Sequence, residues 1–164
     1  MIPNSIALRH RFLFIQTIFV WFIFISGYAQ QYKFYDVDNG LSSSRINSIL
    51  QDSEGYIWVA TEDGLNRFDG SHFVIYRNIP DDSTSLPNNY IKSICEDSKH
   101  RFWVTTMSGL CLYDKVTDRF SRYKILSQDK TKEFTQLFYL MVDHQGYVWI
   151  SVSGNGVICI DADK

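Results

Sequence analysis

The chain has 164 residues, with a hydrophobic fraction of 45% and an aromatic fraction of 16%. This is enough apolar material for a packed core, so the composition argues against a disordered chain. The formal net charge is -2 and like charges do not cluster, so nothing indicates a nucleic-acid or acidic-membrane partner. The aromatic residues favour β-strands, because rings pack well on a pleated, half-buried surface.

Residues 1–29 have the pattern of a secretory signal peptide. Two arginines precede an apolar run of 14 residues from Phe12 to Ile25. Small residues, Gly27 and Ala29, occupy the -3 and -1 places of a cleavage site before Gln30. The alternative is an N-terminal membrane anchor, but a bilayer span needs about 20 apolar residues. We therefore predict export to the periplasm, with no membrane span left after cleavage.

The chain then repeats itself three times. Equivalent aspartates are separated by 45 and 46 residues, a tryptophan follows each aspartate after six residues, and a glycine follows each tryptophan after six or seven. A second aspartate closes each copy. The repeat positions are Asp52, Gly55, Trp58, Gly64 and Asp69; Asp97, Trp103, Gly109 and Asp114; Asp143, Gly146, Trp149, Gly156 and Asp161.

These repeated residues have a structural interpretation. An aspartate can accept backbone N–H groups in the first turn, glycine adopts backbone angles that other residues avoid, and tryptophan can wedge between neighbouring units. A residue that every copy needs is a poor candidate for the single functional residue. We therefore assign no catalytic residue among them.

Each copy predicts short strands without a helical period. The expected strands are Ile46–Gln51, Tyr56–Thr61, Leu65–Asp69 and Phe73–Tyr76; Ile91–Glu96, Phe102–Thr106, Leu110–Asp114 and Phe120–Tyr123; Leu137–Val142, Tyr147–Val152 and Val157–Asp161. Four antiparallel strands per repeat make a β-propeller blade. The predicted fold is all-β: a partial β-propeller of three four-stranded antiparallel blades after a signal peptide, the third blade incomplete.

The expected divisions are a lead-in with an outer, closing strand (30–45), blade 1 (46–76), a linker (77–90), blade 2 (91–123), a linker (124–136) and incomplete blade 3 (137–164). Propellers use about four to eight blades, so three leave sheet edges and blade faces open. We expect a truncated piece of a longer protein, completed by missing blades or associating with itself. The alternative is assembly of several chains into one ring.

Several strings resemble the two-component regulator propeller repeat. They are Gly40-Leu41-Ser42, QDSEGYIWVATEDGLNRFDG, the strand FVIY, and Ser85 to Ile91 at the entry to the second copy. The resemblance covers residues 32–164. It implies the periplasmic sensor region of a hybrid two-component system, which carries two seven-bladed propellers, a membrane helix and a histidine kinase, and in many cases senses glycan breakdown products. The kinase region has no counterpart here, so we expect no enzymatic activity of this chain.

The copies depart from the repeat pattern in two places. The second has Lys99-His100-Arg101 where the others have glycine, and the third has a turn, Ser153 to Gly156, that is one residue longer. We expect the first of these turns to be less regular.

A ligand is expected on one end of the blades. The loop between the second and third strands lies at the same end as the link to the next blade, and amides, hydroxyls and rings gather there. The favoured ligand-binding residues are Arg45, Glu62, Asp63, Asn89, Tyr90, Ser108, Phe138 and Asn155, with Ser44, Asn88, Met107, Gln136 and Ser153 on the same face. These residue types suit an oligosaccharide ligand, although each alone can equally be an ordinary loop residue.

No cofactor or metal is predicted. The histidines at 72, 100 and 144 stand singly in turn regions, and no C-x-x-C pair or paired-histidine spacing occurs. Cys95, Cys111 and Cys159 are interpreted as small buried hydrophobic residues, with a bridge between the first two left open. Two other functions remain: a propeller enzyme of streptogramin-lyase-like or sialidase-like type, and a non-catalytic protein-binding propeller.

Overall fold

The computed structural model describes residues 31–127 and 131–163. The chain divides into two units, Met1–Phe34 and Tyr35–Lys164. The expected signal peptide lies outside the described residues, and all described strands belong to the second unit. Within the described part of the chain, no helical segment has the length and hydropathy of a bilayer span.

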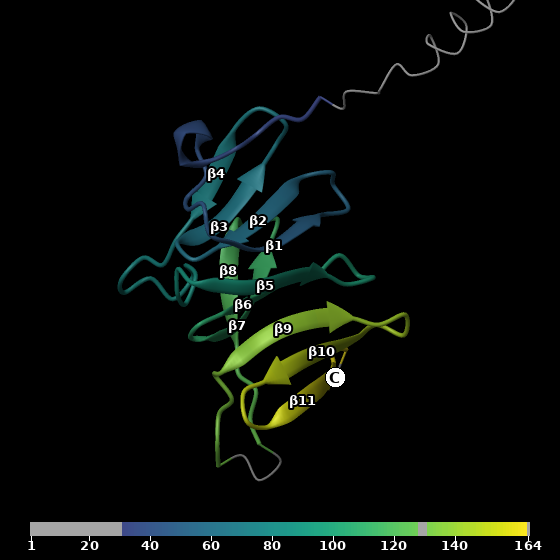
Figure 1. Ribbon diagram of the computed structural model, residues 1–164. Coiled ribbons are helices and arrows are strands. Elements are labelled where there is room, and N and C mark those ends of the chain that lie inside the picture. The colour runs from purple at the N-terminus through teal and green to yellow at the C-terminus, as the bar shows by residue number, and fades with distance from the viewer. Residues whose placement is uncertain (1–30, 128–130, 164) are drawn as a thin grey trace, which may run out of the picture. The chain divides into compact units, whose positions relative to one another are not determined.

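The strands form three antiparallel sheets that follow one another along the chain (Figure 1). The first sheet has the order β1-β2-β3-β4, the second β5-β6-β7-β8, and the third β11-β10-β9. Their bounds are β1 (Ile46–Gln51), β2 (Ile57–Thr61), β3 (Gly64–Phe68), β4 (Phe73–Tyr76), β5 (Ile91–Glu96), β6 (Phe102–Thr106), β7 (Gly109–Asp114), β8 (Arg119–Tyr123), β9 (Leu137–Val142), β10 (Tyr147–Val152) and β11 (Gly156–Asp161). We call the sheets blades 1, 2 and 3.

The observed strands begin and end within one residue of the expected ones. Blades 1 and 2 have the four strands expected, and blade 3 has three strands among the described residues, as expected for the incomplete copy. The lead-in contains a short 3-10 helix, η1 (Val37–Asn39), capped by Asp36. Residues 31–36 form no strand, so the closing strand expected there stays a prediction that needs a partner strand.

The repeated aspartate and tryptophan form the same corner in each blade. In blade 2, Asp97 Oδ1 accepts the backbone N–H groups of Lys99 at 2.9 Å and Arg101 at 3.0 Å. Its Oδ2 accepts the indole Nε1–H of Trp103 at 3.0 Å. Equivalent indole bonds measure 2.8 Å in blades 1 and 3. One carboxylate therefore closes the turn between the first two strands and fixes the rotamer of the tryptophan.

Blade 2 is packed on both faces, and its second strand shows why. Along β6, Phe102 and Val104 belong to a core cluster shared with blade 1, whereas Trp103 belongs to a cluster shared with blade 3. Side chains alternate between the two faces of a strand, so a strand packed on both faces buries every side chain, and its polar ones need hydrogen-bond partners, as Thr105 and Thr106 have. All five residues of β6 are buried accordingly.

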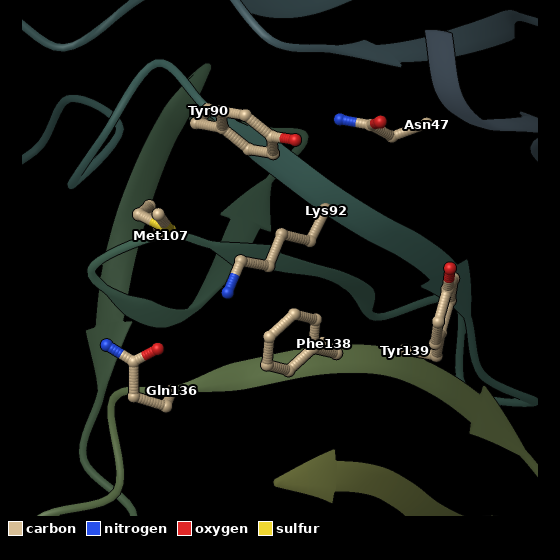
Figure 2. Close-up of a pocket in the computed structure, with 7 residues that line it drawn as sticks. All are labelled: Asn47, Tyr90, Lys92, Met107, Gln136, Phe138 and Tyr139. Carbon is tan, nitrogen blue, oxygen red and sulfur yellow. The ribbon is translucent and has the colours of Figure 1, made fainter. Parts of the chain in front are cut away.

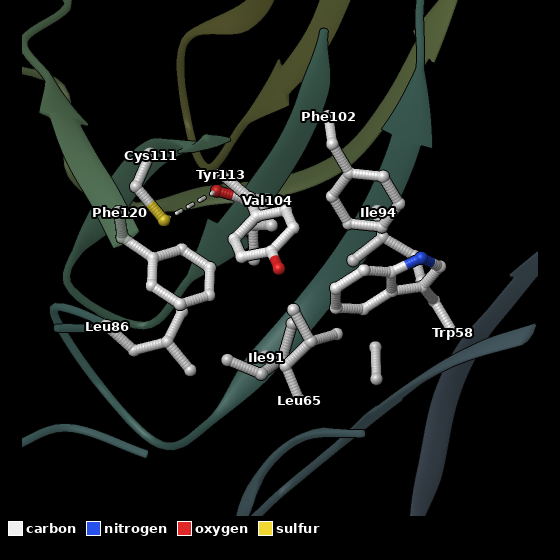
Figure 3. Close-up of a cluster of buried hydrophobic side chains, with 11 residues drawn as sticks. Trp58, Leu65, Leu86, Ile91, Ile94, Phe102, Val104, Cys111, Tyr113 and Phe120 are labelled. Carbon is white, nitrogen blue, oxygen red and sulfur yellow. Dashed lines mark hydrogen bonds between the residues drawn. The ribbon is translucent and has the colours of Figure 1, made fainter. Parts of the chain in front are cut away.

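The core between blades 1 and 2 is built around Trp58 (Figure 3). Its ring centroid lies 4.5 Å from that of Phe102 and 5.0 Å from that of Tyr113. Trp58 is 1% exposed. The linker after blade 1 also contributes, because Leu86 is fully buried in the same cluster. The linker segment is therefore part of the core as well as a connection.

Blades 2 and 3 pack in the same way. Trp103 lies in a cluster with Leu140, Val148 and Ile150 of blade 3 and with Ile125 of the second linker. Thr105 Oγ1 also donates to the carbonyl of Phe138 at 2.8 Å. The two interfaces thus repeat each other, as the sequence repeat requires.

The irregular turn of blade 2 keeps the geometry of its siblings. His100 has φ 62°, close to the φ of 92° at Gly55 and 88° at Gly146. Its N–H donates to the carbonyl of Asp97 at 2.9 Å, as Gly55 N–H does to Asp52 at 3.0 Å. The expectation of a less regular turn is wrong, because the aspartate corner holds a non-glycine residue in the left-handed region, at a cost of about 1–2 kcal/mol.

The cysteines differ in their surroundings, and the structure records all three as free thiols. Cys111 is buried and Cys95 is half-buried, but Cys159 is exposed. The expectation of three buried residues is therefore wrong for Cys159. Its side chain lies on blade 3, and the described chain packs no further sheet beyond that blade.

Candidate functional site

Each loop between the second and third strands meets the segment that enters its blade. The backbone N–H of Glu62 donates to Arg45 at 3.2 Å, and that of Met107 donates to Tyr90 at 3.0 Å. The same bond joins Ser153 to Gln136 at 3.0 Å. These bonds bring both kinds of segment together at one end of each blade, opposite the aspartate corners.

A groove of about 300 Å³ opens at this end, along the first strands of the blades (Figure 2). Its lining combines aromatic rings, two side-chain amides, one thioether and one ammonium group. The lining residues are Asn47, Tyr90, Lys92, Met107, Gln136, Phe138 and Tyr139.

Three of the lining residues are equivalent in the repeat. Asn47, Lys92 and Phe138 are each the second residue of the first strand of their blade. Asn47 donates from Nδ2 to the carbonyl of Ile91 at 2.7 Å, which ties blade 1 to blade 2 at the groove. The groove is therefore lined by the same strand position of successive blades, with a different side chain in each.

Lys92 crosses the floor of the groove toward Phe138 (Figure 2). Its Nζ lies 3.8 Å from the centroid of the phenyl ring, a cation–π contact. The residue is only 9% exposed, and burial lowers the pKa of the ammonium group from its usual value. None of the other six lining residues is charged.

A short polar chain holds the wall formed by Tyr90. Its hydroxyl donates to Glu62 Oε1 at 3.2 Å, and the other carboxylate oxygen binds Arg45 Nη1 at 2.9 Å. The hydrogen bond to Glu62, and after it the negative charge of that carboxylate, raise the pKa of Arg45 above its usual value. Glu62 and Arg45 thus position the ring from behind instead of lining the groove.

The remaining expected ligand residues lie outside the groove. Asp63 binds Arg77 at 2.9 Å and accepts from Asn89 Nδ2 at 3.3 Å. Ser108 accepts a hydrogen bond from Asn88 at 3.2 Å. Asn155 donates to the carbonyl of Ser153 at 2.9 Å and is exposed. Of the eight favoured residues, two line the groove, Tyr90 and Phe138.

Met107 and Gln136, expected on the same face, also line the groove. Sequence reasoning missed Asn47, Lys92 and Tyr139. The signal was available for the first two, because the period of the repeat places both at the position of Phe138. Tyr139 follows Phe138 directly, and only the tertiary structure shows that both neighbours reach the groove.

A second hollow lies on the outer side, between β4 and the first linker. Its polar groups already bind one another: Asp82 accepts the hydroxyl of Thr84 at 2.7 Å, and Asp118 accepts the hydroxyl of Tyr76 at 2.7 Å. Burial raises the pKa of Tyr76, so its hydroxyl stays protonated. Both carboxylates of this hollow are therefore already occupied by hydrogen bonds within the chain.

Among residues 31–127 and 131–163, no group of three or more histidine, cysteine, aspartate or glutamate side chains is placed to hold a metal ion. The arrangement at the groove is one of hydrogen-bonding amides, rings and a cation.

The family model described as "Two component regulator propeller" matches two segments, residues 40–63 and 85–108. Each segment contains the entry to a blade and its first two strands, including the aspartate corner. The matches start 45 residues apart, in register with the period read from the sequence.

Solved structures share the arrangement of the blades. The chain resembles the extracellular domain of the hybrid two-component system BT3049 from B. thetaiotaomicron with a TM-score of 0.71 and 27% identity, over 80% of this chain and 19% of that one. Two structures of the extracellular domain of BT4673 from the same organism give TM-scores of 0.67 and 0.68 at 26% identity. Each is matched over 19% of its length, by 80% and 84% of this chain.

A curated relative is Histidine kinase P4 of Formosa agariphila, 53% identical over 55 residues. The match spans 34% of this chain and 4% of the kinase, so the chain covers a small part of each relative. Residues 40–63 and 85–108 are thus repeats of the two-component regulator propeller family, and the chain folds as blades of the β-propeller seen in extracellular domains of hybrid two-component systems.

Proposed function

We propose that this chain is part of the periplasmic, ligand-sensing propeller of a hybrid two-component system, and that the groove binds an oligosaccharide derived from glycan breakdown. Two kinds of similarity support the sensor role: the repeats match the regulator propeller family, and the solved neighbours are extracellular domains of such systems. The signal would pass to parts of a longer protein, as in the relatives that this chain matches in part.

The single observation that supports a saccharide ligand is the mixture of groups along the groove. Asn47 and Gln136 offer side-chain amides, while Tyr90 and Tyr139 offer rings with hydroxyl groups. Sugars present hydroxyls at their edges and C–H groups on their faces, so amides and aromatic rings match them together. A volume of about 300 Å³ is at the lower end of the range for small-molecule sites.

Binding without turnover fits this lining better than glycoside hydrolysis does. Hydrolysis uses a pair of carboxyl groups on opposite sides of the scissile bond. The seven lining residues include no carboxylate, and Glu62, which contacts the lining residue Tyr90, is also bound to Arg45. We therefore favour a sensor over a propeller enzyme.

The test is calorimetric titration of the purified chain with a panel of neutral and acidic tri- to hexasaccharides. We expect at least one member to bind, and Gln136→Ala to weaken that binding about 10-fold, since a lost hydrogen bond at a desolvated site costs about 1–3 kcal/mol. Asn155→Ala, an amide change outside the groove, is the matched control and should bind as the unaltered chain does. Absence of binding across the panel, or equal effects of both substitutions, would overturn the proposal.

A further inference from the structure

Lys92 differs from the other partly buried lysine of the blades. Lys115 binds Glu96 at 2.8 Å and lies within 3.6 Å of Asp52. The ammonium group of Lys92 has no hydrogen bond and no ion pair with any described residue, and its one electrostatic contact is the cation–π contact with Phe138. The groove therefore contains a cation whose charge no carboxylate of the described chain neutralises.

Such a cation costs free energy. Burial removes water from the ammonium group, and contact with an aromatic ring returns only part of the lost interaction. Glu62, on the far side of Tyr90, is already bound to Arg45 at 2.9 Å and accepts the tyrosine hydroxyl. An anion that entered the groove would regain the lost interaction as a charge-assisted hydrogen bond.

Comparison of the three copies indicates that a blade can form without a lysine at the position of Lys92. Its equivalents are Asn47 in blade 1 and Phe138 in blade 3, so the position does not need a charge to build a blade. The residues that build the blades recur, as Asp97 and Trp103 do. A charge present in one blade only, directed into the groove, is the pattern of a recognition group.

We propose that Lys92 binds an anionic substituent, a carboxylate or a sulfate, on the saccharide that occupies the groove. This inference rests on the proposed function and makes it more specific. The phenyl ring of Phe138 holds the ammonium group in place, and Gln136, next to it in the groove (Figure 2), is available to the neighbouring hydroxyls of the sugar.

The experiment compares pairs of ligands that share a sugar backbone and differ in whether the anionic group is present as such. The carboxylate arm uses α-1,4-linked trigalacturonate and its methyl ester, and the sulfate arm uses a κ-carrageenan tetrasaccharide and its desulfated form. We expect the acidic member of one pair to bind at least about 10-fold more tightly than its neutral partner, the scale of one charge-assisted hydrogen bond. In the variant Lys92→Gln, the two members of that pair should bind within about 2-fold of each other.

The control variant is Lys124→Gln, which makes the same change of charge at an exposed lysine outside the groove. It should retain the preference for the acidic ligand. Equal binding of acidic and neutral members, or a preference that survives Lys92→Gln, would overturn the inference and leave the proposed function standing. Failure of every ligand, neutral and acidic, would instead overturn the proposed function itself.

If a carboxylate of a longer chain were the true partner of Lys92, Lys92→Gln would lower the melting temperature of that longer protein and leave the preference among ligands unchanged. That result would also overturn the inference.

Discussion

Trp103 and Trp149 occupy the same position of the repeat and differ in their exposure. Each donates its indole N–H to the aspartate six residues earlier, at 3.0 and 2.8 Å. Trp103 is 1% exposed beneath blade 3, whereas Trp149 is 40% exposed. The aspartate corner is therefore local and forms in every copy, but the burial of the tryptophan depends on the next blade.

The uncovered face of blade 3 extends beyond this ring. Met141 and Val157 are 58% and 62% exposed, so large apolar side chains lie in water along the sheet. Exposed apolar side chains gathered on one sheet are typical of an interaction surface. By analogy with the two interfaces already present, we expect a further blade, or a second copy of this chain, to cover it.

The largest difference in stability between the two positions should come from replacing Trp103 and Trp149 by alanine. Trp103→Ala should lower the free energy of unfolding by about 3–5 kcal/mol, because it leaves a cavity between two blades. Trp149→Ala should cost less than half as much, since part of that ring is already in water. Urea unfolding followed by circular dichroism measures both, and equal losses would break the comparison.

The next largest difference should come from the aspartates. The carboxylate of Asp97 is fully buried and bound to Arg101 and Trp103, so Asp97→Ala should cost about 3 kcal/mol. Asp143→Ala should cost less, because its indole partner is partly exposed. Chemical denaturation of the two variants side by side provides the test, and a larger loss for Asp143→Ala would contradict it.

Low pH should destabilise the fold by protonating the carboxylates of the aspartate corners. Burial alone would raise the pKa of Asp97, but hydrogen bonds from Trp103 and Arg101 outweigh burial and lower the pKa below its usual value. A lowered pKa contributes stability at pH values above the pKa of the unfolded state, about 4, and that stability is lost as the pH falls through the pKa of the folded state. Melting temperatures measured from pH 6 to pH 2 should therefore drop below about pH 4.

Asp97→Asn should flatten that drop, because the titrating group is gone. Asp143→Asn should flatten it less. A profile that Asp97→Asn leaves unchanged would show that other carboxylates govern the acid transition.

A smaller effect of opposite sign is expected at the irregular turn. His100→Gly removes the strain of a left-handed residue, about 1–2 kcal/mol, but adds flexibility to the unfolded chain. The net gain should be about 0.5 kcal/mol in the free energy of unfolding. Gly146→His, the reciprocal change in blade 3, should destabilise, and a stabilising result there would contradict the strain argument.

Thiol labelling gives the smallest perturbation and reports on the uncovered face. Cys159 should react first with iodoacetamide, because Cys111 is buried and burial raises the pKa of Cys95 to about 12. If a second copy covers blade 3, labelling of Cys159 should slow as the protein concentration rises. Labelling that is independent of concentration would argue against self-association through this face.

The sequence by itself determined the blades. The aspartate, glycine and tryptophan recur at a fixed period, and the aspartate closes its corner through contacts within six residues, as Asp97 does with Lys99, Arg101 and Trp103. Local hydrogen bonds, and the alternation of side chains between the two faces of a strand, can be predicted from residues that are close together in the sequence. That is why the strand bounds could be predicted to within one residue.

Only the tertiary structure decided which side chains meet between blades. It placed Leu86 of a linker in the core and left Trp149 partly exposed. It also brought Asn47, Lys92 and Phe138, from three different blades, to one groove. Which side chains are buried, and which side chains of different blades come into contact, depends on how whole sheets pack against each other. The sequence predicted the face on which four of the lining residues lie. No spacing within a single repeat encodes how the sheets pack, so only the fold shows the groove itself and the unpaired ammonium group of Lys92 in it.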